Sequence, residues 1–171
     1  MNEKKDDLKK NNVSNIAGKY LTFKLENEIY GIEILKVQEI IGLMPITRVP
    51  GMPEYVRGVI NLRGKVIPVI DLRLKFEITS IKDTERTCII VVQISSEDEE
   101  KREIMGIIVD EVAEVIDLEE ENLEATPHFS ADVNTDFILG IGKKDEKIIL
   151  LLNVDKVLAK ISPVVDATKS V

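Results

Sequence analysis

The stretch at residues 57–72, RGVINLRGKVIPVIDL, constrains the fold more than any other part of the chain. Apolar residues stand on both sides of a tight Arg63-Gly64 turn, and the stretch ends in Asp71. This pattern predicts a β-hairpin whose strands are buried on both faces. Pro68 cannot donate to a strand ladder, so its strand is expected to be an edge there or to carry a bulge. None of these side chains is an obvious nucleophile, general base or metal ligand, which favours a protein that binds partners.

Strand patterns recur along the rest of the chain at short spacing. Residues 19–25, KYLTFKL, alternate as in a half-buried strand, with Leu21, Phe23 and Leu25 on the apolar face. Further strands are expected at residues 29–34, about 38–43, 87–94, 104–109, 112–116 and 147–152. One helical turn is expected at 35–37, and a short helix at the end of the fold. Many turn signals and few helices predict an all-β protein of the barrel class.

Two segments of the chain return later in the same order. Residues 30–41, YGIEILKVQEII, align with residues 105–116, MGIIVDEVAEVI, at an offset of 75 positions. Residues 58–72 align with residues 140–154 at an offset of 82, and the second copy has the looser turn. The repeated order predicts two related β lobes. Packing them together would supply burial that either small lobe lacks alone.

The domain boundaries follow from these patterns. We expect a single domain over residues 17–161, between flexible tails at residues 1–16 and 162–171. Within it, lobe one is expected at about 20–76, lobe two at about 87–153, and the closing helix at about 154–161.

Composition excludes some classes of protein and disfavours others. One cysteine among 171 residues rules out an internal disulfide framework, and no apolar run is long enough for a membrane span. The polar N-terminus lacks the apolar core of a signal peptide, so the simplest location is the cytoplasm. A net charge of −8 and a pI near 4.9 disfavour a nucleic-acid-binding barrel, which normally needs a basic face.

Side chains that could carry chemistry are few. The one histidine, His128, stands in a loop beside a proline, and Cys88 stands in an apolar strand as a small core residue. Residues 132–143 begin like a calcium loop, but Phe137 replaces the required glycine and Lys143 the required glutamate. We therefore expect no catalytic residue, no metal and no cofactor.

Two charged residues remain as candidates for recognition. Glu39 lies in VQEII among apolar neighbours, and Arg63 lies at the tip of the hairpin. They can be ordinary surface charges. A guanidinium at a rigid turn can instead grip a carboxylate bidentately, either Glu39 within the lobe or an acid on a partner.

At these residues the chain resembles the bacterial chemotaxis coupling protein family, CheW. The similarity covers roughly residues 19–159. It is carried by the combination of YGI-x-I-x-x-VQEI with GV-x-NLRG-x-x-x-P-x-x-DL, and by GIIVDEVAEVI and FILGIGKKDEKIILLLNVDKVL in the second half. The resemblance implies two SH3-like five-stranded β-barrels packed around a shared hydrophobic core, with a short C-terminal helix.

The resemblance also implies a function and partners. The protein would be a non-catalytic adaptor that joins the cytoplasmic helices of chemoreceptors to the regulatory domain of the histidine kinase CheA, in rings of alternating adaptor and kinase. It would be cytoplasmic and recruited to membrane-associated receptor arrays without inserting into the membrane. The residues at or near the receptor-facing groove would be Val37, Glu39, Ile40, Arg63 and Val109. Phe129 would be a kinase contact, while Val109, in a run apolar on both faces, could equally be a core residue.

Three other functions stay open on the sequence. The chain could be the CheW-like regulatory module of a kinase or of a receiver-linked adaptor, separated from its other domains. An enzyme such as a small hydrolase would need convergent carboxylates with shifted pKa values in a cleft. A nucleic-acid-binding barrel is disfavoured by charge and by the few aromatic residues.

Overall fold

The computed structural model describes residues 13–79, 81–95, 101–129 and 134–159, and these form a mainly β structure. The strands are β1 (Gly18–Leu25), β2 (Glu28–Glu33), β3 (Val37–Gly42), β4 (Val56–Leu62), β5 (Lys65–Asp71), β6 (Cys88–Ser95), β7 (Arg102–Val109), β8 (Glu111–Leu118), β9 (Leu123–Glu124), β10 (Ile138–Lys144) and β11 (Lys147–Leu152). The short helices are η1 (Ile34–Lys36), α2 (Leu72–Lys75), η2 (Glu120–Asn122) and α3 (Val154–Ala159).

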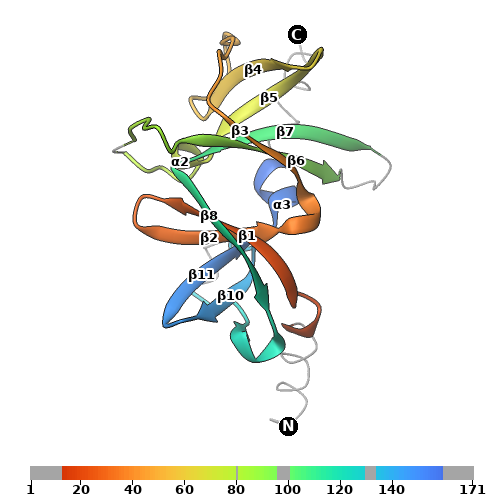
Figure 1. Cartoon of the computed structure of the whole chain (residues 1–171), viewed down its shortest axis with the longest axis vertical. Helices are drawn as coiled ribbons and strands as arrows, with labels where there is room; N and C mark the ends of the chain where they lie inside the picture. The colour runs from red at the N-terminus through yellow and green to blue at the C-terminus, as the bar shows by residue number, and fades with distance from the viewer. Residues whose placement is uncertain (1–12, 80, 96–100, 130–133, 160–171) are drawn as a thin grey trace.

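The strands build two sheets. One has six strands in the order β8-β1-β2-β11-β10-β9, and the other has five in the order β3-β6-β7-β5-β4. Figure 1 shows the two sheets stacked along the long axis of the molecule, with the β4–β5 hairpin towards one end and the β10–β11 hairpin towards the other. The prediction of a mainly β fold with a short C-terminal helix is confirmed. The six-stranded sheet departs from the expected five strands by the two-residue strand β9.

The predicted repeat is reproduced in the strand pairing. The parallel pair Val69–Gly106 joins β5 to β7, and the parallel pair Leu151–Gly31 joins β11 to β2. These two pairs are related by the offsets of 75 and 82 positions that align the two halves of the sequence. The two hairpin turns also match, because both place two residues at positive φ, Arg63-Gly64 in one and Asp145-Glu146 in the other.

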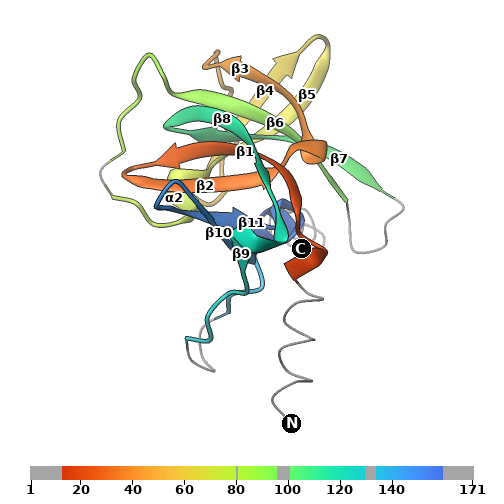
Figure 2. The same cartoon turned by 60° about the horizontal axis from the view of Figure 1, so that its bottom comes forward.

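The predicted division into contiguous lobes is wrong, because the two repeats are interlocked. Strands β1 and β2 belong to the sheet of the second half, and β6 and β7 belong to the sheet of the first half. The chain therefore crosses between sheets twice, from β2 to β3 and from β7 to β8; Figure 2 shows β3 and β8 from a second side. Each sheet takes two strands from one repeat and the others from the second, so neither sheet can form from one repeat alone.

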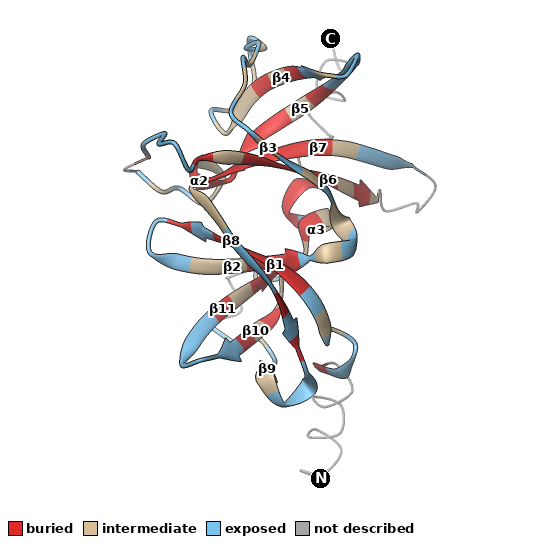
Figure 3. Cartoon of the chain, in the orientation of Figure 1, coloured by how far each residue is buried: buried red, intermediate tan, exposed pale blue. Residues whose placement is uncertain are grey.

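The largest buried cluster lies between the two sheets. It gathers residues from both, including Phe23, Ile32, Ile90, Ile107 and Leu152, and two smaller clusters fill the individual sheets. Figure 3 shows buried segments on strands of both sheets and exposed hairpin tips at their ends. The shared core that was predicted is thus present, and helix α3 contributes Val157 and Leu158 to it.

Two local expectations need correction, and a third is confirmed. Strand β1 is covered on both faces, because Leu21 and Phe23 face the shared core while Tyr20 faces the smaller cluster of the six-stranded sheet. The N-terminal tail ends earlier than residue 16, since Val13 is buried in that same cluster. Pro68 is tolerated because β5 pairs with β7 only from Val69 onward, so β5 is an edge strand at the proline, as expected. The C-terminal tail at residues 162–171 lies outside the described residues.

Candidate functional site

Glu39 and Arg63 form a bidentate ion pair on the surface of the five-stranded sheet. Nη1 of Arg63 donates to Oε1 of Glu39 at 2.9 Å, and Nη2 donates to Oε2 at 2.8 Å. The pair leaves the Arg63 side chain 75% exposed and the Glu39 side chain 25% exposed. Of the two partners considered for Arg63, the structure shows the one within the protein. Because a guanidinium has five N–H donors, Arg63 retains donors for a further acceptor.

The turn that carries Arg63 is held in a defined shape. Arg63 and Gly64 both have positive φ, 54° and 87°, which suits the tight turns that match the twist of a hairpin. The amide of Gly64 donates to the side chain of Asn61 at 2.9 Å. The sequence Asn-Leu-Arg-Gly thus positions the guanidinium at the tip.

A close approach of two segments brings β3 beside this hairpin. Thr47, which follows β3, exchanges two backbone hydrogen bonds of 2.8 Å with Val59 of β4. Gly58 has a φ of 140°, and a Cβ atom on it would lie 2.0 Å from the carbonyl oxygen of Thr47. Only glycine fits there, so Gly58 allows the two edge strands of the sheet to meet and Glu39 to reach Arg63.

Strand β3 also carries apolar side chains, and strand alternation directs Ile40 to the face opposite Glu39. Ile40 is 46% exposed, and Val37 is half-buried against the shared core. Sequence reasoning missed Leu35 in η1, which is 92% exposed, and Leu43, which is exposed just after β3. The repeat could have indicated that Leu35 is exposed. At the offset of 75 positions its counterpart is Asp110, and aspartate is a residue type that favours solvent.

Val109 does not belong to the exposed part of this surface. It is fully buried at 0% exposure in the shared core, so it cannot offer a contact to a partner in this structure. The assignment of Val109 as a contact residue is therefore corrected to the core residue that was the alternative. In a strand that is apolar on both faces, no alternation of polar and apolar residues shows whether a given side chain faces the core or the surface.

Phe129 lies on the part of the chain associated with the other sheet. It is 65% exposed, in the segment that follows β9, and His128 beside it is also exposed. Residues 130–133 after it are outside the described part of the chain. The structure thus does not gather Phe129 with Glu39 and Arg63, which belong to the five-stranded sheet.

A buried charge network was not foreseen from the sequence. Arg73 in α2 is fully buried and donates to Asp71 through two bonds of 2.9 Å, to Asp83 at 2.7 Å and to Asp110 at 3.0 Å. Arg57 adds a bond of 2.9 Å to Asp71. Burial acts to lower the pKa of Arg73, but the hydrogen bonds to the three carboxylates outweigh it and raise the pKa above its ordinary value. These groups are already paired with one another, which makes them a structural element.

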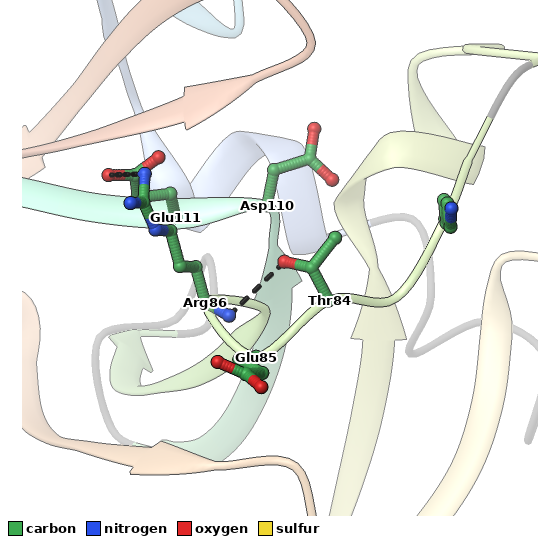
Figure 4. Close-up of a pocket in the computed structure, with 6 residues that line it drawn as sticks. Thr84, Glu85, Arg86, Asp110 and Glu111 are labelled. Atoms are coloured by element: carbon green, nitrogen blue, oxygen red, sulfur yellow. Dashed lines mark hydrogen bonds and ion pairs between the residues drawn. The ribbon is translucent and has the colours of Figure 1, made fainter.

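The pocket beside Asp110 and Glu111 shows, among the described residues, no arrangement of side chains suited to catalysis. This open pocket of about 580 Å³ is lined by Lys82, Thr84, Glu85, Arg86, Asp110 and Glu111. Figure 4 shows Arg86 turned toward Glu111, with which it pairs at 3.5 Å, while Asp110 is engaged by Arg73. Burial raises the pKa of the Cys88 thiol, which makes it less reactive. Among the described residues, no group of histidine, cysteine and acidic side chains could hold a metal ion, and no helix could cross a membrane.

Comparison with known proteins decides the family. The model of the CheW-like domain matches residues 19–162. The chain belongs to the CheW family. It is 38% identical to the chemotaxis protein CheW of Klebsiella aerogenes over 86% of this chain and 88% of that protein, and 36% identical to CheW of Bacillus subtilis over 83% and 87%. The crystal structure of a CheW scaffolding protein from Thermoanaerobacter tengcongensis matches with a TM-score of 0.72, at 36% identity, over 84% of this chain and 93% of that one.

The CheW assignment confirms the predicted class of function. The protein is a chemotaxis coupling scaffold, and such a scaffold is non-catalytic. Membership of the family implies partners within the chemotaxis system.

Proposed function

We propose that the protein couples the cytoplasmic helices of chemoreceptors to the histidine kinase CheA, and that the receptor docks on β3 and the β4–β5 turn. The observation that carries this proposal is the exposed bidentate Glu39–Arg63 pair on β3, a strand on which the side chain of Ile40 is also exposed. An amphipathic helix laid against an apolar surface with a polar rim is a common mode of recognition.

The ion pair supports specificity more than stability. An exposed pair contributes only about 0–1 kcal/mol to folding. Its effect on binding is larger, because the paired carboxylate fixes the direction of the guanidinium before a partner arrives, and less rotamer freedom is then lost. Ile40 and Leu43 supply apolar area, and the free N–H groups of Arg63 supply donors to a receptor carboxylate or carbonyl.

The kinase is proposed to bind at a different place. Phe129 is an exposed aromatic side chain beyond β9, and buried aromatic anchors often dominate the energy of protein interfaces. Its association with the six-stranded sheet, away from Arg63 on the five-stranded sheet, would let both partners bind at once. A ring of alternating adaptor and kinase needs two kinase-facing surfaces on each adaptor, and Phe129 would mark one of them.

Two binding assays with purified partners test the proposal. A receptor signalling-tip fragment and the CheA regulatory domain are titrated against the protein and three variants, Arg63→His, Phe129→Ala and Arg86→His. Arg86 is the matched control, because its side chain is also 75% exposed and also pairs with a glutamate. We expect Arg63→His to weaken only the receptor fragment and Phe129→Ala to weaken only the kinase domain, each by about tenfold or more.

The control variant should bind both partners as the unchanged protein does. A folded Arg63→His protein that binds the receptor fragment with unchanged affinity would remove the receptor role of the pair. Loss of both partners in Phe129→Ala, with the fold intact, would contradict the separation of the two surfaces.

A further inference from the structure

An ion pair to a short helix holds each of the two crossings between the sheets, and the crossing carries the acid in one pair and the base in the other. At the crossing from β7 to β8, Asp110 accepts from Arg73 of α2. At the crossing from β2 to β3, Lys36 donates to Asp155 of α3. Arg73 and Asp155 occupy the same position of the repeat, at the offset of 82. Each short helix thus holds one crossing of the chain, with the charges exchanged between crossing and helix.

Several hydrogen bonds fix the position of the crossing before β8. Oδ1 of Asp110 accepts from buried Arg73 at 3.0 Å, while Oδ2 accepts from the amide of Glu26 at 2.6 Å. Arg73 has further partners in Asp71 and Asp83. Loss of any one of these bonds leaves several others in place.

The crossing before β3 rests on fewer contacts. Nζ of Lys36 donates to Oδ2 of Asp155 at 2.8 Å, and Oδ1 of Asp155 accepts from the amide of Ser95 at 2.9 Å. Both side chains of the pair are partly exposed, at 27% and 28%. Asp155 thus joins η1 to the end of β6 by polar contacts, alongside the apolar packing of Ile34 against the cluster that contains Ile94.

We propose that Lys36 and Asp155 are positioning residues for the receptor-facing surface. Lys36 immediately precedes Val37, and β3 then carries Glu39 and Ile40 to that surface. The pair sets the place where β3 enters the five-stranded sheet, and neither residue needs to touch the receptor. This inference rests on the proposed function of β3 as a receptor-docking strand.

A conservative rescue separates the loss of the ion pair from other effects of the substitutions. The receptor fragment is titrated against the charge-removing variants Lys36→Gln and Asp155→Asn and against Lys36→Arg, which keeps a cation for Asp155 and leaves the bond from Ser95 in place. Asn at position 155 keeps an oxygen that can accept from Ser95, so Asp155→Asn isolates the loss of the ion pair. Lys24→Gln is the control, since Lys24 is an exposed lysine on β1 that forms no described ion pair.

We expect each charge-removing variant to bind the receptor fragment about two- to fivefold more weakly, the range of a partly exposed pair. Lys36→Arg should keep at least half of the affinity that these variants lose. The backbone amide signals of β3 in NMR spectra should shift in the charge-removing variants and stay close to their original positions in Lys36→Arg. The midpoint of urea unfolding and the affinity for the kinase domain should change little in all of them.

Three outcomes would overturn the inference. Unchanged receptor affinity in both charge-removing variants would do so, and so would a Lys36→Arg protein that binds no better than Lys36→Gln. A loss in the Lys24→Gln control equal to that in Lys36→Gln would show a general charge effect. If the unchanged protein fails to bind the receptor fragment, the proposed function fails with it. If the unchanged protein binds while the charge-removing variants match it, only the positioning role fails.

Discussion

Replacement of Arg73 by methionine should destabilise the protein more than any exposed ion-pair variant. Methionine has a similar length but offers no donor. Asp71, which is fully buried, would lose two of its four hydrogen bonds and keep one from Arg57 and one from the backbone amide of residue 73. Asp83 and Asp110 are partly exposed and can be hydrated instead.

The magnitude follows from what remains around Asp71. Breaking a buried ion pair costs about 3–5 kcal/mol, because the other charge is left without compensation. Since Arg57 still pairs with Asp71, we expect a loss near the lower limit, about 3 kcal/mol. For a chain of this size that corresponds to a fall of roughly 6–12 °C in the unfolding midpoint.

Urea unfolding followed by far-ultraviolet circular dichroism measures the change. Arg57→Met and Arg63→Met serve as controls of decreasing expected effect. The Arg57→Met variant keeps both side-chain bonds from Arg73 to Asp71, and Arg63 is mostly exposed. We expect losses of about 1 kcal/mol for Arg57→Met and about 0–1 kcal/mol for Arg63→Met. A loss below about 1 kcal/mol in Arg73→Met, with an unchanged dependence on urea concentration, would refute the reasoning about the buried network.

Further substitutions test other parts of the argument. Val109→Ala should lower the free energy of unfolding by about 2–3 kcal/mol by removing buried apolar volume; equal stability in urea would return Val109 to the candidate surface. Gly58→Ala should prevent the approach of Thr47 to β4 and cost several times the roughly 1 kcal/mol expected for Gly64→Ala, where a Cβ meets open space; similar costs in thermal melts would contradict this. Burial, with a smaller effect of Glu33, raises the pKa of Tyr20 to about 12, so the unfolded state loses its proton first and stability should fall between about pH 10 and 12. Tyr20→Phe should make alkaline unfolding less steep, and an unchanged pH profile would exclude this role of the hydroxyl.

The sequence predicted most about the features that depend on neighbouring residues in the chain. Alternation and β-branched runs located the strands, the Arg63-Gly64 turn located the hairpin, and the offset alignment located both copies of the repeat. It also singled out Glu39 and Arg63, because a charged residue among apolar neighbours and an arginine at a tight turn stand out against their surroundings.

The tertiary structure alone decided how the two copies combine. Parallel pairing of β2 with β11 joins residues more than a hundred positions apart. The sequence of neither strand indicates which other strand it pairs with. The burial of Val109 in the shared core, the contact of Asp110 with Arg73, and the pairing of Lys36 with Asp155 depend on how the strands of the two copies combine. Periodicity reports which face of a strand is apolar, whereas these contacts depend on which strands meet, and that is set by the packing of the whole chain around one shared core.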